Sequence, residues 1–186
     1  MKLIEKTLIE VSENFKKLSQ NCSNEIAEAS ETIISSLKDG GKIMFCGNGG
    51  SAADSQHISA ELVGRYRKKR KALASLSLTT DTSAITAIGN DFNFNDIFSR
   101  QIEAIGKPDD ILYAISTSGN SKNIINAIKV AKNLKIKVIG VTGEDGGEMN
   151  KLCDKIIKVP SNRTDRIQEM HIAIAHIICE RIEDSL

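Results

Sequence analysis

Two short turns are the parts of this sequence best suited to holding an anion. The first, Gly47–Ser51, follows an apolar run, and the second, Ser116–Ser121, follows another one further along the chain. Glycine lets backbone N–H groups come close to an anion, and serine and threonine hydroxyls add neutral hydrogen-bond donors. Each turn precedes a helix-like segment, whose N-terminus favours negative charge. The pair predicts a pocket for a phosphorylated small molecule.

The two turns differ in how specific they are. The first reads Gly-Asn-Gly-Gly-Ser and matches neither the Walker A motif nor GxGxxG, so nucleotide binding is disfavoured. Taken alone, it is equally typical of a tight strand-to-helix turn without a ligand. The second reads Ser-Thr-Ser-Gly-Asn-Ser and is more specific, because four of its six residues carry a hydroxyl group.

A candidate acid–base pair lies on the helix that leaves the first turn. His57 and Glu61 are four residues apart, so both side chains share one helix face. Such a pair can bind a metal ion or set a general base beside an imidazole. A solvated helix face is an equally good interpretation of the pair in isolation. Glu61 would need burial to raise its pKa if it is to act as a strong base.

The terminal helix adds Gln168, His171 and His176 within a largely apolar segment. A histidine in such a segment is usually a core residue. His176 stands out because all three histidines of the chain lie on helices beside the predicted pocket or the buried seam. An imidazole with an ordinary pKa of about 6.5 suits acid–base chemistry at neutral pH.

The elements that must position these residues alternate between strand and helix. Apolar runs predict strands at 42–46, 72–78, 111–115, 137–141 and 155–159; helices are predicted at 51–64, 81–88, 95–105, 121–134 and 165–183. This order predicts an α/β fold, a doubly wound and mainly parallel five-stranded sheet between helices. Ligands of such sheets bind at the C-terminal ends of the strands, where both turns would lie. We expect one domain, 1–186.

The first forty residues read as two extra helices. An apolar stripe with heptad-like spacing marks the first, and Ser23 or Asn24 can cap the second, which would end at 39–41. A helix that precedes the first strand is not needed to cover the sheet. The stripe could pack on its own domain or on another copy of the chain; we favour the latter and expect segment 1–40 to pack in an oligomer. The stripe consists of Ile4, Leu8, Val11, Phe15 and Leu18.

Composition excludes several classes of function. The net charge is +1, so there is no electrostatic case for nucleic acid or for an anionic membrane surface. No apolar stretch could span a bilayer, and the N-terminus does not read as a signal peptide, which predicts a cytoplasmic protein. The basic run 65–71 reads as a solvated turn rather than a partner surface. Four scattered cysteines fit reduced, mostly buried thiols: Cys22, Cys46, Cys153 and Cys179.

Over nearly its whole length the chain resembles a sugar isomerase (SIS) domain and, more narrowly, the phosphoheptose isomerase family. The segments that carry this resemblance are GNGGSAADSQHISAELVGRYR (47–67), TAIGNDFNFNDIF (86–98), AISTSGNS (114–121), VTGEDGG (141–147) and RTDRIQEMHIAIAHIICERIE (163–183). The resemblance implies a flavodoxin-like homotetramer with active sites between subunits. It also implies isomerisation of sedoheptulose 7-phosphate to D-glycero-D-manno-heptose 7-phosphate, the first step toward the activated heptoses of lipopolysaccharide or capsule.

The same resemblance assigns roles by matching position. It implies that Glu61 is the base and His176 the acid. Phosphate would be held by Ser116, Thr117, Ser118 and Ser121, with Asn48, Gly49, Gly50 and Ser51 contributing from the first turn. Asn90, Asp91, Asp165 and Gln168 would line the sugar, with Arg65 as a weaker candidate. One zinc ion per subunit would be bound by residues His57, Glu61, Gln168 and His176.

Helix geometry limits that metal set. Gln168 and His176 are eight residues apart, which is about 12 Å along a straight helix. Both can hardly bind one ion from the same chain. Either the helix is broken near Gln168, or the two residues come from different subunits, and we expect the latter.

Three other functions compete with the isomerase. Residues 51–55 also resemble non-catalytic SIS relatives that bind the bacterial replication initiator, but His176 and the intact second turn favour an enzyme. A sugar-phosphate-sensing regulator is disfavoured because no helix-turn-helix segment lies beside the domain. An amino-sugar isomerase of the same fold is disfavoured by the helix that carries Gln168 and His176.

Overall fold

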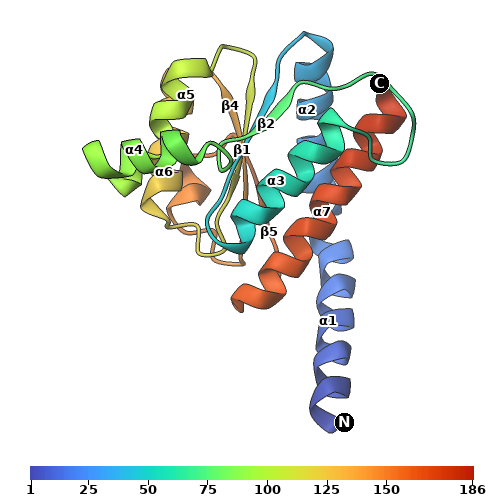
Figure 1. Cartoon of the computed structure of the whole chain (residues 1–186). Coiled ribbons are helices and arrows are strands. Elements are labelled where there is room, and N and C mark those ends of the chain that lie inside the picture. The colour runs from blue at the N-terminus through green and yellow to red at the C-terminus, as the bar shows by residue number, and fades with distance from the viewer.

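The computed structural model describes residues 1–186, which form one parallel sheet with helices on both faces (Figure 1). The strands are β1 (Ile43–Cys46), β2 (Ser75–Ser77), β3 (Ile111–Ile115), β4 (Lys137–Thr142) and β5 (Lys155–Lys158). Their order is β2-β1-β3-β4-β5, and every neighbouring pair is parallel. This is a doubly wound order with its switch point between β1 and β3. The predicted fold class is confirmed, and the sheet is parallel throughout.

The strand register brings the two glycine- and serine-rich turns to one edge of the sheet. Cys46, the last residue of β1, pairs directly with Ala114 near the end of β3. The first turn therefore leaves the sheet beside the second one. Because the crevice at a switch point lies outside the carboxyl ends of these two strands, the turns occupy the expected ligand position.

The helices form two layers. One face of the sheet is covered by α2 (Ser23–Lys38), α3 (Gly50–Val63) and α7 (Thr164–Ser185). The other face carries α4 (Thr82–Asp91), the 3₁₀ turn η1 (Phe94–Asp96), α5 (Ser99–Ile105) and α6 (Lys122–Asn133). A second 3₁₀ turn, η2 (Glu148–Lys151), precedes β5. In Figure 1, α3 and α7 lie side by side, and they contact each other and the strands of the sheet.

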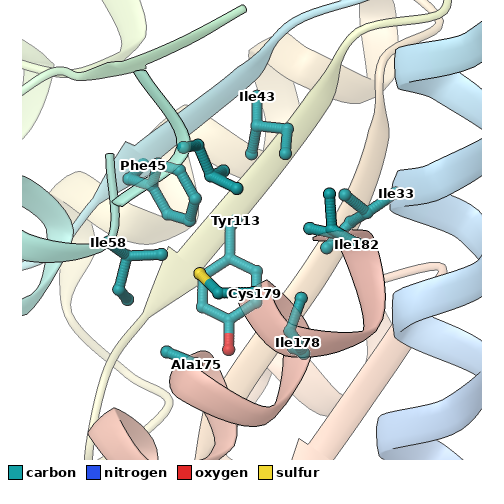
Figure 2. A pocket seen from close by; sticks show the side chains of 10 residues that line it. Ile33, Ile43, Phe45, Ile58, Tyr113, Ala175, Ile178, Cys179 and Ile182 are labelled. Atoms are coloured by element: carbon teal, nitrogen blue, oxygen red, sulfur yellow. The ribbon is translucent and has the colours of Figure 1, made fainter. Parts of the chain in front are cut away.

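The core beneath α3 and α7 is apolar and nearly closed. Figure 2 shows a small cavity there, lined by 10 hydrophobic residues that include Phe45, Tyr113 and Cys179. The hydroxyl group of Tyr113 is buried without a hydrogen-bond partner, and burial raises its pKa. Tyr113 packs against Phe45 with ring centroids 5.3 Å apart. This packing gives α3 and α7 a firm apolar base.

Helix α1 (Lys2–Asn21) extends away from the body of the molecule (Figure 1). Leu18 at its inner end is buried, whereas Ile4 is 62% and Leu8 is 64% exposed at its outer end. The apolar stripe predicted from the sequence is thus only partly covered within one chain, and its packing on another copy stays a prediction. No helix of the structure combines the length and the apolar character needed to cross a membrane.

Three local predictions were wrong. The strand predicted at 72–78 spans only Ser75–Ser77, because the N–H group of Leu73 bonds to Leu62 of α3 at 3.1 Å instead of joining the sheet. The helix predicted at 95–105 is divided into η1 and α5. The side-chain amide of Asn126 in α6 donates a hydrogen bond to the carbonyl oxygen of Asn95 at 3.2 Å, so this carbonyl is bonded outside the predicted helix. Neither Ser23 nor Asn24 caps α2: the Ser23 hydroxyl donates to the carbonyl of Ser19.

Other local predictions were correct. Asp81 caps α4, its carboxylate accepting a hydrogen bond from the N–H group of Ala84 at 2.9 Å. All four cysteines are free thiols, and three of them are buried; Cys153 is half-buried. His171 is a core residue, with 2% of its surface exposed.

Candidate active site

The first turn opens the N-terminus of α3. Gly49 caps this helix with a φ of +57°, a conformation that side chains rarely adopt, and no atom lies within 4 Å of the position its Cβ would take. Gly47 has no such space, since a Cβ there would stand 2.6 Å from the carbonyl oxygen of Ser51. Glycine is therefore required at 47 for close packing and at 49 for conformation, and open space lies beside Gly49.

The second turn presents hydroxyl groups beside the first. The hydroxyls of Ser116 and Ser121 lie 3.1 Å apart, Ser116 is buried, and Ser118 is exposed. Gly119 has a φ of +66°, and its missing Cβ would collide with the carbonyl oxygen of Gly146 at 2.2 Å. The turn is thus packed on the loop that follows β4, which holds its donors in place.

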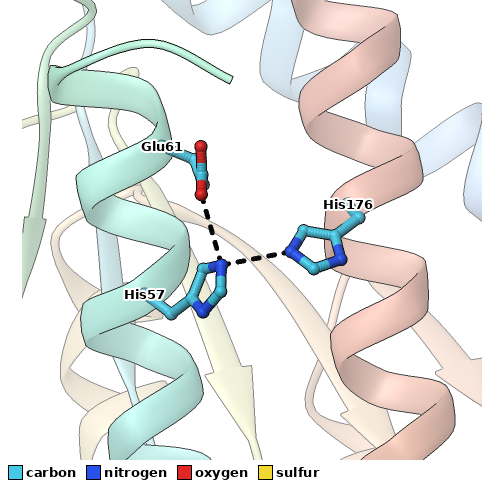
Figure 3. A group of neighbouring side chains, drawn as sticks. All are labelled: His57, Glu61 and His176. Carbon is cyan, nitrogen blue, oxygen red and sulfur yellow. Dashed lines mark hydrogen bonds and ion pairs between the residues drawn. The ribbon is translucent and has the colours of Figure 1, made fainter. Parts of the chain in front are cut away.

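Three side chains converge between α3 and α7 (Figure 3). His57 Nε2 lies 3.2 Å from Glu61 Oε1 and 3.1 Å from His176 Nε2. The side chains of His57 and Glu61 are 48% and 25% exposed, so the group is open to solvent on one side. Local sequence explains the first pair, since positions 57 and 61 share a helix face, whereas His176 arrives from the far end of the chain.

One nitrogen atom, His57 Nε2, contacts both partners. A proton carried on this atom could be donated either to the Glu61 carboxylate or to His176 Nε2, since both lie within hydrogen-bond distance. The candidate ligand atoms of the three residues all lie within 4.8 Å of one another. Two imidazole nitrogens and one carboxylate oxygen form a donor set typical of catalytic zinc sites that keep an open position. The residues present therefore fit a zinc ion.

Two further side chains, Tyr66 and Asp54, lie beside the group of His57, Glu61 and His176. The ring of Tyr66 stacks on His176 with centroids 5.6 Å apart and planes 23° from parallel. Asp54 lies one turn before His57 on α3; burial raises the pKa of its carboxyl group, and the nearby His57 and His176 partly oppose that rise. The site therefore combines two half-buried carboxyl groups, two imidazoles and a stacked aromatic ring.

Gln168 lies apart from the three converging side chains. Helix α7 is unbroken from Thr164 to Ser185, and Gln168 sits against the first turn: a Cβ on Gly50 would stand 2.8 Å from Gln168 Nε2. The two parallel helices thus pair Gly50 with Gln168 at one end and His57 with His176 further along. Within one chain Gln168 borders the first turn.

The remaining predicted residues are dispersed. Asn90 and Asp91 are exposed at the end of α4 on the opposite face of the sheet, where Asn90 donates to Asp91 at 2.8 Å. Asp165 pairs with Arg163 at 2.8 Å, and this hydrogen bond lowers the pKa of its carboxyl group. Arg65 is exposed in the loop after α3 and donates to the carbonyl of Arg67. Ser51 is buried in the first turn of α3, and Thr117 is half-buried in the second turn.

The sequence did not indicate that Tyr66 and Arg70 lie beside the site. Tyr66 and Arg70 belong to the basic run that reads as a solvated turn, yet that run is bound to the acidic end of α7 through Glu180, Glu183 and Asp184. The usable signal was the opposite charge of the basic run and of the acidic end of α7. Nothing local in the sequence indicated which of them would be buried.

Comparisons with known proteins agree with this architecture. A family model for the SIS domain matches residues 8–143, which defines the class of the fold. The phosphoheptose isomerase of Rhodospirillum rubrum is 54% identical over 166 residues, covering 89% of this chain and 88% of that protein. A phosphoheptose isomerase of Campylobacter jejuni is 56% identical over 166 residues and 89% of each chain. The chain belongs to the phosphoheptose isomerase family of SIS-domain proteins, as its motifs predicted.

Solved structures show the same likeness in three dimensions. The phosphoheptose isomerase GmhA from Neisseria gonorrhoeae superposes with a TM-score of 0.94 at 41% identity, over 98% of both chains. A phosphoheptose isomerase from Francisella tularensis gives a TM-score of 0.95 at 35% identity, over 98% of this chain and 97% of that one. The match extends over the N-terminal helices as well as the sheet.

Proposed function

We propose that this chain isomerises the ketose sedoheptulose 7-phosphate to the aldose D-glycero-D-manno-heptose 7-phosphate. The family relationship supports the substrate class, and one observation supports the chemistry: a carboxylate, Glu61, and an imidazole, His176, meet across His57 between α3 and α7, where the side chains are partly exposed to solvent. The product would feed the synthesis of nucleotide-activated heptoses for lipopolysaccharide or capsule, in the cytoplasm.

The reaction moves a carbonyl group from C2 to C1 of the sugar. Glu61 takes the carbon-bound proton from C1, a cis-enediol forms, and the same carboxyl group returns a proton to C2. His176 moves the proton between the two oxygen atoms, so no proton is gained or lost overall. The proximity of both groups to His57 supports this division, because a proton can pass between the imidazole nitrogens at 3.1 Å.

The two turns supply the binding energy for the phosphate. The hydroxyl groups of the second turn offer neutral donors, and the open end of α3 beside Gly49 adds the positive end of a helix. We assign phosphate binding to Ser116, Thr117, Ser118 and Ser121, and contacts from the first turn to Asn48, Gly49, Gly50 and Ser51. Held there, a seven-carbon chain would extend its C1 end toward Glu61 and His176.

A zinc ion bound by His57, Glu61 and His176 would supply a Lewis acid that polarises the oxygens of the sugar. A carboxylate that gives its lone pair to a cation is a weaker base. With zinc bound, Glu61 would therefore serve either as a ligand of the ion or as the base, but not as both at once.

We infer that the working unit is a homotetramer of one-domain chains. Three features of the isolated chain support assembly: an uncovered apolar stripe on α1, a Gln168 placed away from the metal-type residues, and Asn90 with Asp91 on the opposite face of the sheet. In this assembly Gln168 of one subunit joins the three converging residues of another. Asn90, Asp91 and Asp165 would likewise reach the sugar across subunit boundaries, and Arg65, the weaker candidate, would contact it from the loop after α3.

The test is turnover of sedoheptulose 7-phosphate by purified protein, with and without added zinc, beside a Glu61→Gln variant. Turnover that the substitution abolishes would support both the reaction and its base. A well-folded assembly that is inactive with and without zinc would refute the proposal. It would then favour the non-catalytic alternative, binding of the replication initiator, which the resemblance of residues 51–55 suggests.

A further inference from the structure

A buried carboxylate joins the loop after α3 to the last turn of α7. Glu183 is 7% exposed and accepts four hydrogen bonds. The backbone N–H groups of Tyr66, Arg67 and Lys68 donate at 2.8, 2.9 and 2.9 Å, and Arg70 Nε donates at 3.0 Å. Burial raises the pKa of Glu183, but these donors outweigh it and bring the pKa down to about 2. Glu183 is thus a charged, fully bonded anchor.

The same arginine reaches α3. Arg70 Nη1 donates to the carbonyl of Leu62 at 2.8 Å, and Arg70 Nη2 donates to the carbonyl of Glu61 at 2.8 Å. The last carbonyl groups of a helix have no partner within the helix, and a cation is favoured there. The guanidinium group therefore caps the final turn of α3 while it is bound to α7 through Glu183. A lysine could not make these bonds at once, because it lacks the planar fork.

This pair, the Arg70–Glu183 clamp, contacts the elements that carry the proposed chemistry. It binds the backbone of Glu61 directly. It also fixes the backbone of Tyr66, whose ring stacks on His176. Arg65, a candidate sugar-binding residue, immediately precedes the loop that Glu183 holds.

Neighbouring ion pairs do not share these properties. Lys68 pairs with Asp184 and Arg67 with Glu180, but the four side chains are between 46% and 61% exposed and bind neither α3 nor its carbonyl groups. Exposed pairs of this kind stabilise a protein little. Each exposed pair nevertheless joins a basic residue of the same loop to an acidic residue of the same helix end. The exposed pairs therefore serve as matched controls for the Arg70–Glu183 pair.

We propose that the Arg70–Glu183 clamp is a positioning device that sets Glu61 on α3 against His176 on α7. This inference rests on the proposed isomerase function. Neither clamp residue touches the reacting atoms; each acts through the backbone and ring that it holds. Loss of the clamp should shift the two groups relative to each other while the phosphate turns, at the opposite end of α3, stay in place.

The experiment compares Arg70→Lys, Glu183→Gln, the double variant and Asp184→Asn with wild-type protein in steady-state turnover of sedoheptulose 7-phosphate. For both single variants we expect kcat to fall about 10- to 100-fold with KM changed less than about threefold, since misplacement affects the transition state and not phosphate binding. The kcat of the double variant should be about equal to that of the less active single variant, because both substitutions disrupt the same pair. Asp184→Asn should keep kcat within about twofold of wild type.

Crystal structures of the same variants give a readout that does not depend on turnover. We expect Arg70→Lys to separate the Tyr66 and His176 rings while the sheet is unchanged. An inactive wild type would refute the isomerase function. The stacking of Tyr66 on His176 in the variant structures would then be the only test of the clamp. Wild-type kcat or an intact ring stack in a folded Arg70→Lys protein would overturn the proposal. So would loss of folding in both single variants, because the pair would then hold the fold and not the site.

Discussion

The side-chain amides of Asn48 and Asn123 form a reciprocal pair that joins the first turn of the site to the start of α6, directly after the second turn. Asn48 Nδ2 donates to Asn123 Oδ1 at 3.0 Å, and Asn123 Nδ2 donates to Asn48 Oδ1 at 2.8 Å. Asn48 follows β1, and Asn123 lies in the first turn of α6 and is 3% exposed. The pair fixes the two turns relative to each other and leaves one N–H and one lone pair of the Asn48 amide for a ligand.

Asn123→Asp should weaken this junction. The substitution keeps the shape but replaces an N–H donor with a carboxylate oxygen that faces Asn48 Oδ1. We expect the free energy of unfolding to fall by about 1–3 kcal/mol, the usual cost of an unmatched buried polar group. Urea denaturation measures it. Asn24→Asp, at an exposed position, should change the value by less than about 0.5 kcal/mol, and equal effects of the two variants would contradict the role of the pair.

Glu61→Gln and His176→Gln should each fold and assemble but lose turnover. Both residues are half-buried and neither belongs to the apolar core, so neither change opens a core cavity. An amide can neither take the carbon-bound proton nor move a proton between oxygens, and we expect kcat to fall by at least about 100-fold. Thermal denaturation, light scattering and turnover are measured on the same samples. Wild-type activity in either variant would remove that residue from the mechanism.

The buried histidine should make stability depend on pH. Burial lowers the pKa of His171 from 6.5 to about 4. The unfolded chain therefore binds more protons than the folded one between these values. The stabilisation is complete above pH 6.5 and is lost as the pH falls toward 4, by about 3 kcal/mol in total. His171→Leu should lose less stability across this interval in urea denaturation at stepped pH. Identical pH profiles for the two proteins would contradict the burial of a neutral ring.

The apolar stripe of α1 should be required for assembly. Ile4 and Leu8 are exposed in the single chain, so replacing both with serine leaves the sheet and its core untouched. We expect light scattering to show a smaller species and circular dichroism to keep its helical signal. Turnover should be lost if, as proposed, residues of two subunits complete each site. Lys6→Ala on the same helix is the control and should assemble normally. A fully active monomer would show that each chain carries a complete site.

Zinc binding should depend on His57. Its Nε2 is the atom that contacts both other candidate ligands, so His57→Ala removes one of three donors and the link between the remaining two. We expect wild-type protein to bind one zinc ion per chain in calorimetry and the variant to bind at least about 10-fold more weakly. His171→Leu, which changes a buried histidine away from the three residues, should bind zinc as wild type does. Unchanged affinity in His57→Ala would place the metal elsewhere.

Local pattern was sufficient for much of this molecule. Alternation of apolar strands with helices predicted the parallel sheet, and the positions of Gly47–Ser51 and Ser116–Ser121 after two strands placed both turns at one edge. The spacing of His57 and Glu61 put both on one face of α3, because a helix repeats every 3.6 residues. These features depend on residues that are close in sequence, whose relation is set by backbone geometry alone.

Tertiary structure decided the rest, because it depends on contacts between distant segments. The approach of His176 to His57 spans 119 positions, and the bonds from Glu183 to the loop at 66–68 span 115 to 117. No local spacing distinguishes Glu183 from the exposed Glu180 and Asp184 beside it; only the packing of α7 on α3 makes it the buried partner. The sequence by itself thus determined the fold, the family and the residue types of the site, and the packing of the two helices decided which of those residues meet.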